Sequence, residues 1–181
     1  MPDFKAQLLP FNPKNSPAIN VHCQGTFPDP STVNVSFSLS GDLKFVSIDT
    51  PVNKGKRTDN LWQKTCFEIF IKNAANTSYW EYNLSPTAHW AIYGFNDYRS
   101  DRFDELSVNE LSINSELSAD EFLLSSQLAL PTALVGQNLE IGLSTVVQVN
   151  NGDIYYYALN HPCEQPDFHH AAGFTIFRKT L

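Results

Sequence analysis

The 181-residue chain has few cysteines, few basic residues and no long apolar run. Its cysteines, Cys23, Cys66 and Cys163, are odd in number and widely spaced, so they indicate neither a disulfide framework nor a zinc site. With 12 Lys and Arg against 19 Asp and Glu, the formal net charge is -7 at pH 7. This charge argues against a nucleic-acid partner, which clustered basic residues would attract. No apolar run approaches the roughly 20 residues that span a bilayer, so we expect no membrane partner.

Signatures of catalysis and cofactor binding are also scarce. The eight glycines are scattered and form no phosphate-binding loop, and the chain has no Gly-x-Ser-x-Gly elbow. The single methionine is Met1, which excludes a Met–His pair of haem ligands. We therefore expect no cofactor and favour a binding protein over an enzyme. The stretch Met1–Pro13 lacks the apolar core of a secretory signal, so we expect a protein of the reducing cytoplasm.

Aromatic residues are abundant, with 13 Phe, seven Tyr and three Trp, and they favour strands. Val33, Val35, Phe37 and Leu39 alternate with polar residues, which is the pattern of a half-buried strand. We expect strands over residues 33–39, 43–49, 65–72, 79–84, 89–95, 105–117, 122–130, 139–149, 154–159 and 174–178. The three strands within 65–95 should form a meander, Asn151-Gly152 a hairpin turn, and residues 131–136 a short helical turn. The chain is predicted to form one domain, residues 1–181, an all-β, two-sheet antiparallel β-sandwich of jelly-roll or immunoglobulin-like type with at most short helical turns.

A first group of candidate site residues surrounds the predicted meander. Trp62 lies in a polar loop, where an exposed indole could stack on a sugar ring or instead fold back to cap one end of the sandwich. Glu68 lies on the face of its strand opposite Phe67 and Ile69, and it could accept sugar hydroxyls if that face is concave. Asn83 shares a face with Glu81 on the next strand and could stand opposite Glu68.

A second group comprises His161, Asp167, His169 and His170. By composition these residues resemble a metal site or an acid–base set. Adjacent His169 and His170 point in opposite directions on an extended segment, however, which disfavours a shared metal ion. A structural role, with Asp167 holding backbone amides, and a direct role in ligand contact both remain open.

These motifs carry a family resemblance. Leu61-Trp62-x-x-Thr65-Cys66-Phe67-Glu68, Glu81-Tyr82-Asn83-x-Ser85-Pro86, Trp90-Ala91-x-Tyr93 and Pro166-Asp167-Phe168-His169-His170 resemble the DOMON-like proteins, a bacterial group related to family 9 carbohydrate-binding modules. The resemblance implies a β-sandwich that holds sugar rings between two tryptophans. It implies platforms at Trp62 and Trp90, hydroxyl partners at Glu68 and Asn83, and calcium in the loops, although no acidic cluster here indicates a calcium site.

We therefore expect a module that binds a small ligand, with a carbohydrate or a sugar-containing metabolite as the first hypothesis. One alternative is a hydrolytic enzyme that uses Glu68, the three histidines of the second group and a metal ion. Another is a protein–protein interaction module whose exposed aromatic side chains contact a partner.

Overall fold

The computed structural model describes residues 1–180, and its regular elements are strands and short 3₁₀ turns. The strands are β1 (Phe4–Pro10), β2 (Ile19–Asp29), β3 (Thr32–Gly41), β4 (Cys66–Asn73), β5 (Tyr79–Leu84), β6 (Trp90–Phe95), β7 (Phe103–Asp104), β8 (Ile113–Leu117), β9 (Glu121–Ala129), β10 (Leu139–Gln148), β11 (Ile154–Ala158) and β12 (Ile176–Arg178). The turns are η1 (Leu43–Phe45), η2 (Leu61–Gln63), η3 (Thr132–Leu134) and η4 (Ala171–Gly173). No helix within residues 1–180 is long and apolar enough to cross a membrane.

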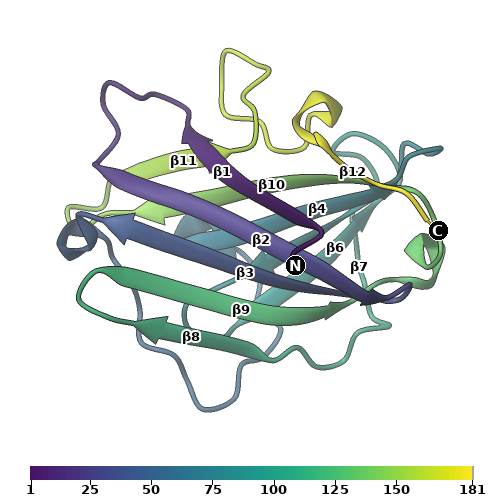
Figure 1. Ribbon diagram of the computed structural model, residues 1–181, viewed down its shortest axis with the longest axis horizontal. Helices are drawn as coiled ribbons and strands as arrows, with labels where there is room; N and C mark the ends of the chain where they lie inside the picture. The colour runs from purple at the N-terminus through teal and green to yellow at the C-terminus, as the bar shows by residue number, and fades with distance from the viewer. Residues whose placement is uncertain (181) are drawn as a thin grey trace.

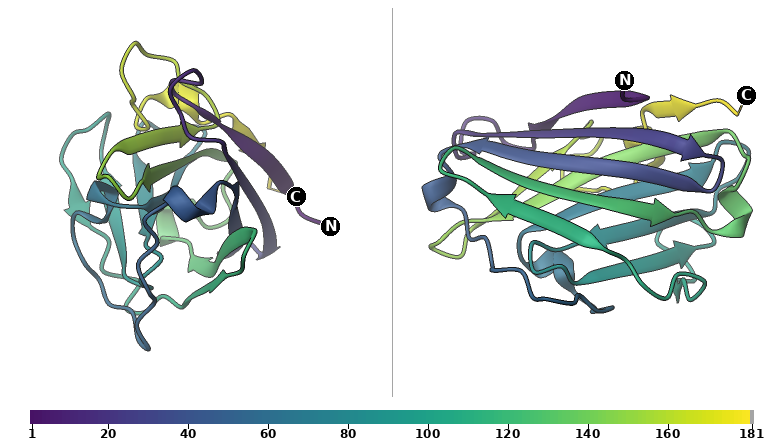
Figure 2. Two further views of the ribbon diagram at one scale, coloured as in Figure 1. Left: turned by 90° about the vertical axis from the view of Figure 1, so that its left-hand side faces the viewer. Right: turned by 60° about the horizontal axis from the view of Figure 1, so that its bottom comes forward.

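The 12 strands form one antiparallel sheet that curls so that its two halves face each other (Figures 1 and 2). The front half in Figure 1 contains β1, β2, β3, β9 and β8, and the back half contains β7, β6, β5, β4, β10, β11 and β12. Strand β1 joins the halves, because residues 4–8 pair with β2 whereas Leu9 and Pro10 pair with β11. The prediction of an antiparallel all-β fold is confirmed, but the two layers belong to one continuous sheet rather than to two separate ones.

The main core lies between the two halves. Phe67 of β4 packs between two rings of the front half, with ring centroids 5.2 Å from Phe37 and 5.8 Å from Phe122. All three side chains are almost completely buried, as the alternating sequence pattern predicts. Apolar burial of this kind is the main force that holds the two halves together.

Most of the local predictions match the structure. The meander of β4, β5 and β6, the turn η3 and the hairpin between β10 and β11 are confirmed. The strand expected at residues 43–49 is wrong, because this stretch begins with the turn η1. The turn brings Leu43 and Val46, three residues apart, to the same side, and both side chains are buried. The strand expected at 105–117 shortens to β8, and β1 and β2 were not predicted.

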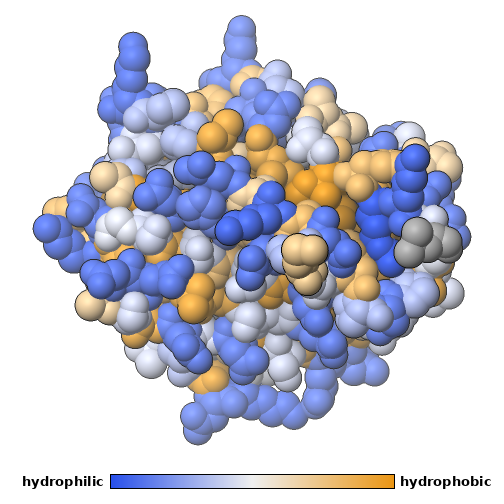
Figure 3. Space-filling model, in the orientation of Figure 1, coloured by the Kyte–Doolittle hydropathy of each residue, from blue (hydrophilic) through white to orange (hydrophobic). Residues whose placement is uncertain are grey.

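The outer faces of the two halves differ. On the front half, Figure 3 shows mostly hydrophilic residues, with hydrophobic residues scattered among them and gathered most densely to the right of centre. On the back half, aromatic side chains of β4, β5 and β6 form a second apolar cluster, against which Phe168 and Phe174 of the segment after β11 pack. That segment therefore covers part of the outer face, and β4, β5 and β6 are buried on both sides.

Candidate ligand-binding groove

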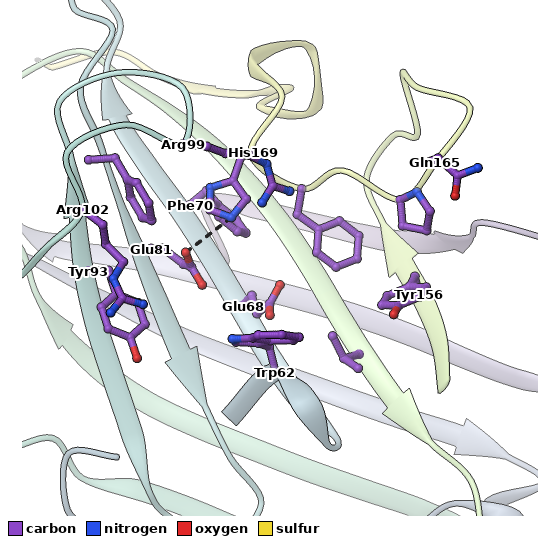
Figure 4. A pocket seen from close by; sticks show the side chains of 14 residues that line it. Trp62, Glu68, Phe70, Glu81, Tyr93, Arg99, Arg102, Tyr156, Gln165 and His169 are labelled. Atoms are coloured by element: carbon purple, nitrogen blue, oxygen red, sulfur yellow. Dashed lines mark ion pairs between the residues drawn. The ribbon is translucent and has the colours of Figure 1, made fainter. Parts of the chain in front are cut away.

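A cavity of about 610 Å³ opens on the outer face of the back half (Figure 4). Its lining comes from the meander, from β10 and β11, from η2 and from the loops that follow β6 and β11. The lining residues are Trp62, Glu68, Phe70, Glu81, Tyr93, Phe95, Arg99, Arg102, Val146, Tyr156, Gln165, Pro166, Phe168 and His169. This set combines aromatic walls with a few charged groups, which is the composition of a small-molecule site.

Two glutamates form the floor of the groove. Glu68 and Glu81 are 3% and 6% exposed and project from neighbouring strands on the same face. The Ser144 hydroxyl donates to Glu68 Oε2 at 2.6 Å, and the Asn83 amide donates to Glu81 Oε1 at 2.6 Å. Burial and the adjacent charge of Glu81 raise the pKa of Glu68 to about 8. Burial also raises the pKa of Glu81, although its hydrogen bond from Asn83 acts in the opposite direction.

His169 stands beside this floor as a neutral imidazole. Burial, followed by the positive charge of Arg99, lowers its pKa to about 4. The Tyr79 oxygen accepts the backbone N–H of Arg99 at 3.1 Å and lies 2.7 Å from His169 Nδ1. We therefore assign the Tyr79 hydroxyl as the donor of a hydrogen bond to Nδ1. In this assignment Nδ1 is the acceptor, so Nε2 carries the imidazole proton. Nε2 is 3.7 Å from Glu81 Oε2 (dashed line in Figure 4).

Arg99 is held in place from outside the groove. Its Nη2 donates to Asp167 Oδ1 at 2.9 Å, and the Tyr98 hydroxyl donates to Asp167 Oδ2 at 2.6 Å. Burial opposes ionisation of Asp167, but these two hydrogen bonds hold its pKa below the ordinary value. Arg99 has a backbone φ of 50°, a left-handed conformation that costs free energy in a non-glycine residue. The tight loop thus presents a guanidinium whose direction is fixed by a carboxylate.

Trp62 is the most exposed aromatic side chain of the groove. It lies on η2, where its neighbour Leu61 packs against the outer apolar cluster. The indole remains 50% exposed and stands close to Glu68 in the view of Figure 4. The groove therefore has a flat apolar surface next to buried hydrogen-bonding groups.

Two residues of the first predicted group lie elsewhere. Trp90 is 2% exposed in the main core, because alternation along β6 turns Ala91 and Tyr93 toward the groove and Trp90 away from it. Its ring packs under the Arg57 guanidinium at 4.4 Å, so it offers no platform for a ligand. Asn83 is 1% exposed and lies beneath the floor, where it supports Glu81.

The second predicted group separates in space. Of its four members only His169 lines the groove. His161 Nε2 lies 2.8 Å from the Leu9 carbonyl oxygen, whereas His170 Nδ1 accepts the Ala172 N–H and caps η4. Asp167 acts on the groove through Arg99. The three histidines therefore do not converge with Glu68, and within residues 1–180 no three His, Cys, Asp or Glu side chains are placed to hold a metal ion.

Two of the three cysteine side chains are buried. Cys66 is fully buried below the floor, and burial raises the pKa of its thiol well above the ordinary value. Cys23 is buried in the main core with its pKa raised for the same reason.

Several lining residues were missed from the sequence. Arg99 and Arg102 belong to a charged loop without any periodic signal, and Tyr156 lies in a run of three tyrosines in which no single member stands out. Arg102 lies with its guanidinium carbon 4.6 Å from the centre of the Tyr93 ring, a cation–π contact between a loop and a strand. No sequence spacing encodes such a contact.

Comparison with known proteins defines the class of fold. No family model and no curated protein matches the sequence. A candidate carbohydrate-binding protein from Bacteroides uniformis matches in structure with a TM-score of 0.70 and 11% identity, over 94% of this chain and 84% of that chain. The chain therefore shares its fold with that protein.

Two further matches are more distant. A family 9 carbohydrate-binding module from Caldicellulosiruptor kristjanssonii in complex with glucose has a TM-score of 0.46 and 11% identity, over 80% of this chain and 68% of that chain. A family 9 module from the same organism in complex with cellotriose has a TM-score of 0.47 and 10% identity, over 87% and 70%.

Proposed function

We propose that this protein binds a carbohydrate, or a metabolite that contains a sugar, in the groove above Glu68 and Glu81. The observation that carries the proposal is the half-exposed Trp62 standing beside two buried carboxyl groups in one cavity. An indole face covers the C–H face of a sugar ring, while buried carboxyl groups and a fixed guanidinium bind hydroxyl groups. Both requirements of sugar recognition thus meet in one place.

The size and the fold support the same class of ligand. A cavity of about 610 Å³ lies within the usual range of small-molecule sites and has room for roughly one or two sugar rings. The Bacteroides uniformis protein that shares the fold is described as carbohydrate-binding, and the motif resemblance to the DOMON-like proteins favours the same ligand class. Binding rather than hydrolysis is proposed because the two carboxyl groups lie side by side on the floor, whereas hydrolysis needs them on either side of the scissile bond.

The test is isothermal titration calorimetry with glucose, galactose, mannose, xylose and arabinose, and with short oligosaccharides built from them. We expect at least one of these sugars to bind, and Trp62→Ala to weaken its affinity by about tenfold or more. Phe45→Ala is the matched control, because Phe45 is also 50% exposed but lies outside the groove. The proposal is refuted if no sugar of the panel binds, or if the two variants bind alike.

A further inference from the structure

The two floor carboxyl groups are short of hydrogen-bond donors. Each receives one donor, from Ser144 or from Asn83, although a carboxylate can accept about four hydrogen bonds. Within residues 1–180 no lysine or arginine lies within ion-pair distance of either carboxyl group, although the charge of Arg99 lowers the pKa of both from farther away. His169, which lies near Glu81, is neutral. In the described part of the chain, Glu68 Oε1 and Glu81 Oε2 thus have no donor within hydrogen-bond distance, since His169 Nε2 is 3.7 Å from Glu81 Oε2. Both glutamates line the same cavity.

The carboxyl groups of Glu68 and Glu81 also affect each other's ionisation. In the register of β4 and β5, Glu68 lies opposite Asn83 and Phe70 lies opposite Glu81, so the two glutamates are diagonal neighbours on one face. Ionising both in a buried floor places two negative charges side by side, so the pair retains one proton near neutral pH. The pair then contains one carboxyl that can donate a hydrogen bond and one carboxylate that can only accept.

We propose that Glu68 and Glu81 act as one recognition unit for two adjacent hydroxyl groups of a saccharide, one accepting from the protonated carboxyl and the other donating to the carboxylate. This inference rests on the proposed function and narrows it to sugars with a free vicinal diol. A hydroxyl group can both donate and accept, so a neighbouring pair of them complements this floor. An anionic substituent at the same position would be repelled by the negative charge of the carboxylate.

The shared proton makes binding depend on pH. Above about pH 8 the carboxyl pair loses its shared proton, so it no longer donates a hydrogen bond to the ligand. A bound ligand then also shields a second negative charge from water, which costs free energy. We therefore expect the dissociation constant to rise by up to about tenfold for each pH unit above 8.

Other titratable or charged groups face the pair from the surrounding elements: Cys66 on β4, Tyr79 on β5, Tyr93 on β6, Tyr156 on β11, Arg99 and Arg102 in the loop after β6, and His169 in the segment after β11. Burial raises the pKa of the Cys66 thiol and raises that of Tyr79 to about 12, whereas that of His169 is about 4. These three groups therefore keep one protonation state through the range in which the carboxyl pair ionises.

The experiment uses the panel sugar that binds most tightly, together with its singly deoxygenated analogues. We expect the affinity of the wild-type protein to be constant from about pH 6 to 7.5 and to fall above about pH 8. Glu68→Gln keeps an N–H donor and cannot ionise, so it should bind with little pH dependence. Glu81→Gln removes the anionic acceptor and should weaken binding by about tenfold between about pH 6 and 7, where Glu68 is protonated. Glu116→Gln, on the exposed part of β8, is the control and should behave as the wild type.

The deoxygenated analogues test the diol. Removal of either of two adjacent hydroxyl groups should cost about tenfold or more, whereas removal of the others should cost less. A wild-type affinity that stays constant through about pH 9.5, a Glu68→Gln variant with the wild-type pH dependence, or equal losses for all analogues would each overturn the inference. If any of these results occurs while Trp62→Ala still weakens binding by about tenfold or more, the proposed function survives. If no panel sugar binds, both fail. Should Glu68→Gln not fold, the wild-type pH profile and the analogues still decide.

Discussion

Replacing Glu68 by Gln should change how stability depends on pH, and this prediction needs no ligand. The pKa of Glu68 is about 8 in the folded protein against an ordinary value of 4.5. Between these values the folded protein holds a proton that the unfolded chain releases. The free energy of unfolding must therefore fall as pH rises through this window, by about 1.4 kcal/mol per pH unit for one proton.

His169 imposes the opposite slope over part of the range. Its pKa of about 4 lies below the ordinary 6.5, so the unfolded chain binds the extra proton and stability rises with pH between these values. The two effects oppose each other below about pH 6.5, and Glu68 acts without this opposition from about pH 6.5 to 8. In this upper window the wild type should lose stability relative to Glu68→Gln by about 1.4 kcal/mol per pH unit.

The assay is urea unfolding followed by tryptophan fluorescence, repeated at half-unit steps of pH for the wild type, Glu68→Gln and the exposed control Glu116→Gln. Only the slope against pH is compared, so a constant offset from the altered hydrogen bond to Ser144 does not matter. Parallel curves for the wild type and Glu68→Gln would refute the reasoning, because they would mean that Glu68 is already ionised in the folded protein at neutral pH.

Three further predictions follow from the packing and the groove. Phe67→Ala should lower the free energy of unfolding by about 3 to 5 kcal/mol in urea titrations, because a fully buried ring is removed, whereas Phe45→Ala should change it little; similar losses would contradict the core described. Asp167→Asn should weaken binding of the panel sugar by about three- to fivefold in calorimetry, because Arg99 loses its anchor, and unchanged affinity would argue against that role. The His169 imidazole should stay neutral down to about pH 4 by NMR titration, and a midpoint near 6.5 would show that it is not buried as described.

The sequence indicated correctly which side chains of β4 point into the main core. Along β4, Phe67 and Ile69 point into the core and Glu68 away from it, as period-2 alternation predicts. The platform expected at Trp90 is wrong, and that expectation came from the family resemblance rather than from alternation. Alternation along β6 places Trp90 on the core side with Ile92.

The burial of Glu68 could not be read from the sequence. A strand that alternates apolar and polar residues is normally solvated on its polar side. Glu68 is buried because the turn η2 and the segment after β11 form the walls of the groove around it. The raised pKa of Glu68 follows from that cover and from Glu81 on the neighbouring strand, so it has no local signal either.

By itself, the sequence determined the antiparallel all-β class, the central meander and the core-facing residues of strands such as β3 and β4, because alternation is a local property of each strand. Only the tertiary structure decided that Trp62, Glu68, Glu81 and His169 meet in one groove while His161 and His170 remain outside it. Strand register and loop crossings bring together residues far apart in the chain, and these depend on packing across the whole sheet. The two carboxyl groups on which the proposed function depends lie on different strands, and only the fold places them side by side.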